Sequence, residues 1–165
     1  MAQHNAAHVD ELIDFCDAEG FPVVFQPARN SLFLGSDRDG AAFQAEGDAL
    51  RRAFDRIEAR KRAGAAVGNA WSSLRHFRNF PEDTELPCAA GWISATMDPQ
   101  GNLYHCGQVS RTVTLANVVR QGAAAAFAQL ERRGCGACWC ARVVEGNQLW
   151  GGRIDRLLPL RRATR

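Results

Sequence analysis

The sequence predicts an α+β protein in which a helix-strand-helix portion precedes a small module that carries most of the cysteines. Two patterns predict this: an amphipathic helix leads into a short apolar run near the N-terminus, and a later stretch alternates, turns and resumes as a β-hairpin does. Between them, "PEDTELP" at 81–87 combines two prolines with four polar residues. We therefore expect domains at 1–80 and 81–150, followed by a basic tail at 151–165.

The first portion reads as helix, strand and two further helices. Apolar residues at helical spacing predict a helix over 8–19, which Gly20 ends, and the apolar run "FPVVFQP" at 21–27 predicts a buried strand of a parallel sheet. A second helix is expected over 47–63, with Asp48 as a possible cap, and a short third one over 69–80.

The second portion reads as a hairpin followed by a helix. "GWISATMDPQGNLYHC" at 91–106 alternates in the manner of a strand, turns at 98–101 and resumes at Asn102. The alanine-rich run at 115–134 predicts one helix that ends at Arg-Arg-Gly. The segments "VVEGNQLWGG" and "IDRLLPLRR" are short and do not distinguish a helix from a strand.

Composition narrows the classes of function. A chain of 165 residues with 46% hydrophobic and 23% charged residues is typical of a globular protein, and a net charge of +2 gives no reason to expect a nucleic-acid partner. It has neither a run of eighteen apolar residues nor a signal peptide at its start, so we expect no membrane partner and a cytoplasmic location. The tail at 153–165 holds five arginines, and a solvated terminus explains it better than a phosphate-binding arm.

Five of the six cysteines form a candidate metal site. Cys16 lies on the apolar face of the first predicted helix and is interpreted as structural. Cys88 and Cys106 flank the predicted hairpin, and "GCGACWC" at 134–140 adds the remaining three candidates. A Cys-x-x-Cys spacing lets two thiolates converge on one centre. The candidates are Cys88, Cys106, Cys135, Cys138 and Cys140.

Other roles for these thiols fit the sequence less well. A reducing cytoplasm disfavours disulfides. A nucleophilic cysteine paired with His105 is disfavoured because adjacent residues of a strand point to opposite faces. A thioredoxin-like dithiol would follow a strand rather than a helix. Structural zinc and an iron-sulfur cluster both remain open on spacing alone.

The hairpin stretch resembles a known family. In "CAAGWISATMDPQGNLYHCG", twelve residues separate Cys88 from Gly101 and four separate Gly101 from Cys106. This is similar to the opening motif of the SPASM and twitch domains, the auxiliary-cluster modules at the C-terminus of radical S-adenosylmethionine enzymes. The resemblance implies that Cys88, Cys106, Cys135 and Cys138 bind one auxiliary 4Fe-4S cluster, as in the shorter twitch form, with Cys140 as an alternative ligand.

The resemblance also implies a partial (β/α) barrel, of which residues 1–80 would be the last part. The Cys-x-x-x-Cys-x-x-Cys loop that such enzymes use to hold the S-adenosylmethionine cluster does not occur in this sequence. We therefore expect the chain to be the C-terminal piece of a longer enzyme acting on a peptide or small molecule, and not to be catalytic alone. S-adenosylmethionine would bind only the full-length form.

Two further expectations concern the surroundings of the cluster. Trp92, Trp139 and Trp150 could shield it, although ordinary packing explains buried tryptophans as well. Glu145 and Asn147 could orient the site, but a surface position is the expectation for both. From another class of function, a zinc-binding structural or interaction module would use the same four thiolates.

Overall fold

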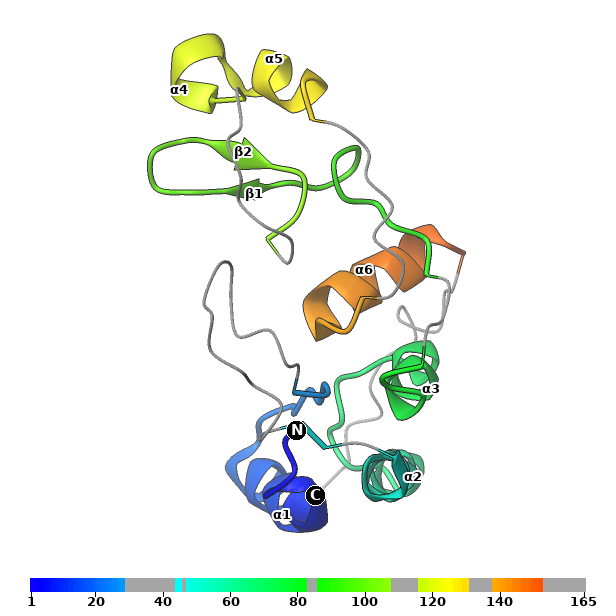
Figure 1. Ribbon diagram of the computed structural model, residues 1–165. Coiled ribbons are helices and arrows are strands. Elements are labelled where there is room, and N and C mark those ends of the chain that lie inside the picture. The colour runs from blue at the N-terminus through cyan, green and yellow to red at the C-terminus, as the bar shows by residue number, and fades with distance from the viewer. Residues whose placement is uncertain (29–43, 46, 83–85, 108–115, 131–137, 153–165) are drawn as a thin grey trace. The chain divides into compact units, whose positions relative to one another are not determined.

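The computed structural model describes residues 1–28, 44–45, 47–82, 86–107, 116–130 and 138–152. The chain divides into two compact units. The first contains 1–30, 39–87 and 136–165, and the second contains 31–38 and 88–135. Within the described residues the fold is α+β, and the one regular sheet has two antiparallel strands (Figure 1).

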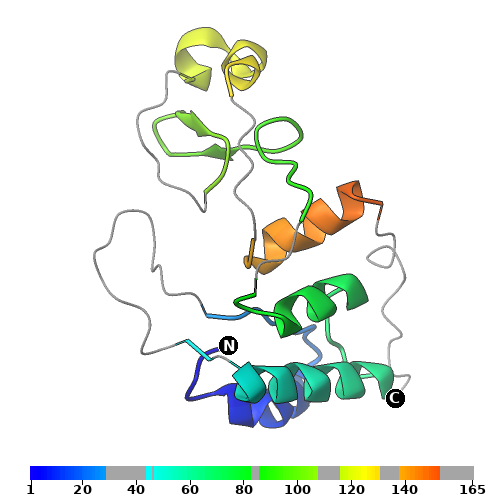
Figure 2. The ribbon, with the colours of Figure 1, turned by 45° about the vertical axis from the view of Figure 1, so that its right-hand side comes forward.

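The first unit is a stack of helices. A short 3-10 helix, η1 (Ala6–His8), runs into α1 (Val9–Glu19), which packs beside α2 (Gly47–Arg62). In two views, α3 (Trp71–Arg78) lies between α2 and α6 (Ala141–Trp150) (Figures 1 and 2). The predicted helices over 8–19, 47–63 and 69–80 are thereby confirmed to within two residues at each end. Helix α2 begins one residue before Asp48, which therefore lies in its first turn rather than at its cap.

One hydrophobic core joins these helices. Ile13 of α1, Leu50 and Phe54 of α2, and Phe77 of α3 are all fully buried in it. Full burial of a side chain of this size contributes about 1.5–3 kcal/mol each relative to exposure. The apolar spacing that predicted the helices is thus the spacing of the residues that hold them together.

The predicted strand over 21–27 is wrong. Gly20 ends α1 with a left-handed φ of 77°, as expected, but the next residues form a single parallel bridge between Val23 and Val67. Pairing goes no further because the side chain of Asn69 replaces a neighbouring strand: its Oδ1 accepts from Phe25 N at 2.7 Å, and its Nδ2 donates to Phe25 O at 2.9 Å. Val24 is 54% exposed, so the run is not buried throughout either.

The second unit is built on a hairpin. Strands β1 (Thr96–Met97) and β2 (Leu103–Tyr104) pair antiparallel, with Thr96 opposite Tyr104, which confirms the predicted hairpin and its turn. The strands are shorter than the alternation suggested. Residues 91–94 instead fold into a turn in which Ile93 N and Ser94 N both donate to Ala89 O.

The single helix predicted over 115–134 is also wrong. Two short helices, α4 (Val118–Gln121) and α5 (Ala123–Ala128), occupy the described part of this stretch. Gly122 separates them with φ 80° and ψ 155°, a conformation outside the helical region that glycine adopts without a side-chain clash. The expected Arg-Arg-Gly end lies outside the described residues.

Candidate metal centre

The turn of the hairpin is held by one carboxylate. Asp98 Oδ1 accepts from the backbone N–H groups of Gln100 and Asn102 at 3.0 and 2.9 Å, and Oδ2 accepts from the Tyr104 hydroxyl at 2.9 Å. The side chain of Asn102 also donates to Oδ2 at 2.9 Å, and this bond is the first cause of a lowered Asp98 pKa. The ionised carboxylate therefore fixes the loop between the strands.

A second polar side chain ties the turn to α4. Asn117 caps that helix, with its Oδ1 accepting from Val119 N and Arg120 N, while its Nδ2 donates to Gln100 O and to Asn102 Oδ1. Gly101 has φ 81°, and a Cβ there would lie 2.7 Å from Val119 Cγ2. The Asp-Pro-x-Gly signature thus reflects both a left-handed position and a close approach of the helix.

The hairpin leads directly to one of the predicted ligands. Cys106 follows β2 by two residues and is buried, and Gly107 lies against the side chain of Thr96 at the start of β1. Cys88 is half-buried and precedes β1 by eight residues, with the turn at 91–94 between them. Both cysteines belong to the second unit.

The segment that contains Cys138 and Cys140 is pinned inside the first unit. Trp139 stacks on His76 with ring centroids 4.4 Å apart and meets the edge of Phe80 at 5.0 Å. Nε2 of His76 donates to Cys138 O at 2.6 Å, because a carbonyl oxygen accepts only. These contacts fix the backbone of residues 138–140, which carry both thiols.

The segment is held equally firmly on its C-terminal side. Cys140 occupies the N-cap of α6, and Ala141 N, the next amide, donates to Gln26 Oε1 at 2.8 Å. The N-terminal end of a helix carries partial positive charge and so favours an anionic ligand group such as a thiolate. Cys138 is buried and Cys140 half-buried.

Burial controls the protonation of His76. Loss of hydration lowers its pKa from the ordinary value, and the hydrogen bond to Cys138 O opposes that shift without reversing it. A neutral imidazole with its proton on Nε2 is therefore the form that holds Cys138 at neutral pH. Sequence reasoning missed His76, because a histidine on a helix gives no signal that it will contact a segment sixty residues later.

The structure places four of the five candidate cysteines and leaves one undescribed. Cys88 and Cys106 lie in the second unit, Cys138 and Cys140 lie in the first, and Cys135 falls outside the described residues. None of the four described candidates is joined to another described cysteine in a disulfide. Among the residues that the structure describes, no three or more histidine, cysteine or acidic side chains form a metal-binding group. Cys16 on α1 is also free and half-buried.

The expectation of surface positions for Glu145 and Asn147 is wrong. Both are buried, and Glu145 Oε1 accepts from Ala70 N, just ahead of α3, at 2.9 Å. The carboxylate of Glu145 therefore satisfies the N–H of Ala70, the N-cap residue of α3, from another helix. The spacing of Ala141, Val144 and Gln148, three buried residues of α6, is the only sequence signal that could have placed this face inward.

The three tryptophans near the cysteines have different environments. Trp139 is buried between aromatic rings, as described above, whereas Trp92 is 48% and Trp150 61% exposed. Only Trp139 therefore has the packed position expected of a tryptophan that shields a buried group. The basic tail at 153–165 lies outside the described residues.

Comparisons with family models, with curated proteins and with solved structures found no match to this chain. In the part of the chain that the structure describes, no helix is both long and apolar enough to cross a membrane.

Proposed function

We propose that this chain binds one auxiliary 4Fe-4S cluster and is the C-terminal portion of a radical S-adenosylmethionine enzyme. The ligands are Cys88, Cys106, Cys135 and Cys138, with Cys140 as the alternative to Cys138. The observation that carries the proposal is the spacing of Cys88, Gly101 and Cys106 around a hairpin whose turn requires that glycine.

The donor set suits an iron-sulfur cluster. Thiolates are the usual protein ligands of 4Fe-4S clusters, and none of the four described candidates is joined to another described cysteine in a disulfide. Buried Cys106 and Cys138 would keep water from the cluster, and the contacts of His76 and Trp139 hold Cys138 in place. Bound there, such a cluster would supply electron transfer with substrate or a fixed point that orients it.

The wider proposal is that the chain forms the end of a partial (β/α) barrel and a twitch-like module. The single bridge between Val23 and Val67 supports the first part by its direction alone, because the strands of a (β/α) barrel pair parallel. An upstream reading frame that encodes Cys-x-x-x-Cys-x-x-Cys would support the proposal, and an upstream frame without it would count against it.

Anaerobic purification of the chain tests the cluster directly. We expect a brown protein with broad visible absorption and about four iron atoms per chain. Cys88→Ala and Cys135→Ala should each lose the iron, whereas Cys16→Ala, a matched change outside the ligand set, should retain it. Full iron in either of the first two variants would refute the ligand set.

Two further outcomes separate the alternatives. A colourless protein with one zinc per chain would support a zinc-binding structural module instead. Cys138→Ala and Cys140→Ala, compared for iron content and far-ultraviolet circular dichroism, decide which of the two is the ligand: the ligand variant loses iron and the other keeps it. The dichroism shows that the loss does not come from unfolding of α6.

A further inference from the structure

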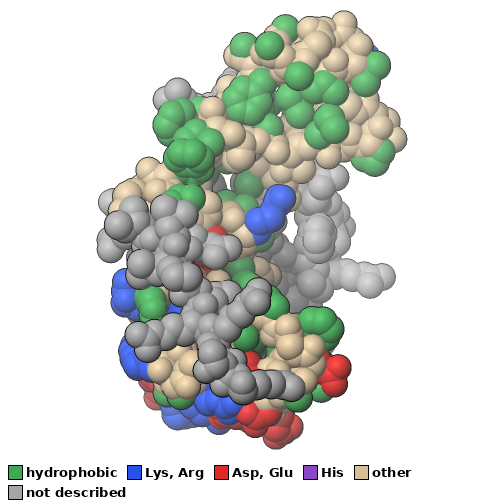
Figure 3. All heavy atoms as spheres, turned by 180° about the vertical axis from the view of Figure 1, so that it is seen from behind, with side chains coloured by type: hydrophobic (Ala, Val, Ile, Leu, Met, Phe, Trp, Pro, Cys, Tyr) green, Lys and Arg blue, Asp and Glu red, His purple; other side chains and the backbone are tan. Residues whose placement is uncertain are grey.

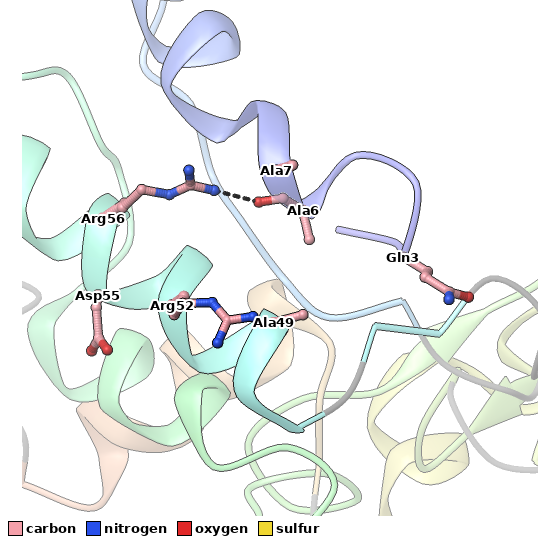
Figure 4. Close-up of a pocket in the computed structure, with 7 residues that line it drawn as sticks. All are labelled: Gln3, Ala6, Ala7, Ala49, Arg52, Asp55 and Arg56. Carbon is pink, nitrogen blue, oxygen red and sulfur yellow. Dashed lines mark hydrogen bonds between the residues drawn. The ribbon is translucent and has the colours of Figure 1, made fainter.

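The first unit contains a solvent-open cavity at the junction of η1 and α2, and most of its lining residues, Arg52 included, are exposed. Its volume is about 460 Å³, within the range of pockets that hold small organic molecules. Three alanines form much of its wall, Ala6 and Ala7 from η1 and Ala49 from the first turn of α2 (Figure 4). Methyl side chains at all three positions leave the space open and make this part of the wall apolar.

The polar part of the wall carries two arginines from one face of α2. Arg52 and Arg56 are one turn apart, and both extend away from the direction taken by Asp55, the acidic residue of the lining (Figure 4). Asp55 is engaged elsewhere: its carboxylate accepts from Arg78 at 2.6 and 3.2 Å, and these bonds are the first cause of its lowered pKa. The carboxylate of the lining is therefore neutralised from outside the cavity.

The two arginines differ in their partners. Nη2 of Arg56 donates to Ala6 O at 2.7 Å, and its Nε lies 3.8 Å from Asp10 Oδ2, so both its position and part of its charge are accounted for. Arg52 forms neither a hydrogen bond nor an ion pair in the part of the chain that the structure describes.

The other arginines of α2 all have carboxylate partners, which makes Arg52 exceptional on this helix. Arg51 pairs with Glu82 at 2.7 Å, Arg60 with Asp14, and Arg62 with Glu58 at 2.7 Å. A planar guanidinium presents parallel N–H donors that match the two oxygens of a carboxylate. The amide of Gln3, on the opposite side of the cavity, is exposed and can supply a further donor.

We propose that this cavity binds a small organic carboxylate, with the anionic group on Arg52 and a short apolar body against Ala6, Ala7 and Ala49. The guanidinium of Arg52, which has no partner among the described residues, selects the charge, and the alanine wall selects an organic ligand over an inorganic ion. No cysteine lines the cavity, so this site is independent of the proposed cluster.

Titration of the full chain with benzoate, followed by amide resonances in ¹⁵N-labelled protein, tests the site. We expect saturable shifts at Ala6, Ala7, Ala49 and Arg52. Benzyl alcohol, which lacks the charge, and inorganic phosphate, which lacks the apolar body, should each bind about tenfold more weakly, the factor expected when one charge-assisted hydrogen bond or a comparable apolar contact is lost.

Two variants and a control localise the binding. Arg52→Gln should weaken benzoate binding by about tenfold or more, whereas Arg142→Gln, at an exposed position of α6, should leave it unchanged. Ala49→Leu keeps the charge and a good helix former but fills the cavity, so it should abolish binding without lowering the melting temperature. Equal weakening in both arginine variants, undiminished binding to Ala49→Leu, or no saturable shift with benzoate would each overturn the proposal.

Discussion

The two units of this chain are stabilised by different means. Charged side chains surround α1 and α2 in the first unit, where Arg78 pairs with Asp55 and Arg60 with Asp10 and Asp14 over an apolar core. The described part of the second unit has two charged residues, Asp98 and Arg120. Figure 3 shows the difference on one face: acidic and basic side chains gather on the lower part, whereas the upper part is mostly apolar or uncharged.

The difference between the two units shows how a small module can keep its fold with a small hydrophobic core. Its described buried cluster is small, Leu103 with Ala116 and Ala126, and its turn depends on hydrogen bonds to Asp98 and Asn117. Exposed ion pairs of the kind that surround α2 contribute about 0–1 kcal/mol each, so the first unit rests mainly on its core. Substitutions should therefore destabilise the first unit mainly by removing core volume, and the second unit mainly by disturbing the backbone geometry of its turn.

The largest effect is expected from Phe77→Ala. Phe77 is fully buried and its ring lies 6.0 Å from that of Phe54, so truncation should lower the free energy of unfolding of the first unit by about 3–5 kcal/mol. Urea unfolding followed by circular dichroism measures this. Phe15→Ala, at a position that is 59% exposed on α1, is the control and should cost less than about 1 kcal/mol.

Hydrogen exchange at Leu103 N, which donates to Ala116 O at 2.8 Å, extends this test to the second unit. Its protection should be unchanged in Phe77→Ala if the units are stabilised separately. Equal loss of protection in both units would show instead that they unfold together.

An intermediate effect is expected from Gly101→Ala. The substitution places a side chain at φ 81° and a Cβ 2.7 Å from Val119 Cγ2, and should destabilise the hairpin by about 1–3 kcal/mol. Gly122→Ala is the matched control, because φ there is 80° but no atom lies within 4 Å of the new Cβ. Exchange at Asn102 N and Leu103 N should accelerate more in the first variant. Similar rates in both would mean that the approach of α4 has no energetic consequence.

The smallest effect is a difference in acid sensitivity. Burial lowers the pKa of His76 in the folded first unit, so the unfolded chain takes up its proton first and stability falls as pH drops below about 6.5. Hydrogen bonds lower the pKa of Asp98, so its contribution persists until the pH falls below the ordinary carboxyl range and is then lost.

Amide spectra recorded from pH 7.5 to 3 separate these two transitions. Changes around Trp139 should begin at higher pH than changes around Asn102. Replacement of His76 by Gln should remove the first transition and leave the second, and Asp98→Asn should do the reverse. A single transition common to both regions would contradict this division.

Much of the fold was predictable because its signals are local. The spacing of Val9, Ile13 and Leu50 with their neighbours predicted helices, and Asp98 with Gly101 predicted the hairpin turn. The failures came from residues whose partners are distant. Nothing near "FPVVFQP" shows that Asn69 will replace a strand beside it. The alanine run concealed the break at Gly122, because alanine favours a helix on both sides of it.

The candidate sites divide in the same way. The cysteine spacing is a local feature of the sequence, so the candidate metal ligands could be named from it. The hydrogen bonds from His76 to Cys138 O and from Ala141 N to Gln26 are tertiary contacts, which the sequence does not reveal. The cavity on α2 was missed for another reason. From the sequence, an arginine-rich helix is expected to be solvated. Arg52 differs from the other arginines of α2 only in the structure, where those arginines have carboxylate partners.

The contact between Ala70 and Glu145 has a consequence for synthesis on the ribosome. Residues 88–135 are made between α3 and α6, although both helices belong to the first unit. At roughly 5–20 residues per second, the 72 residues from the end of α3 to the end of α6 take about 4–14 seconds, so α3 waits that long for the helix that covers it while residues 88–135 are made first. The usual order of N-terminal before C-terminal folding is therefore interrupted: the hairpin can form before His76 has the Cys138 carbonyl and the Trp139 ring that it contacts in the folded chain.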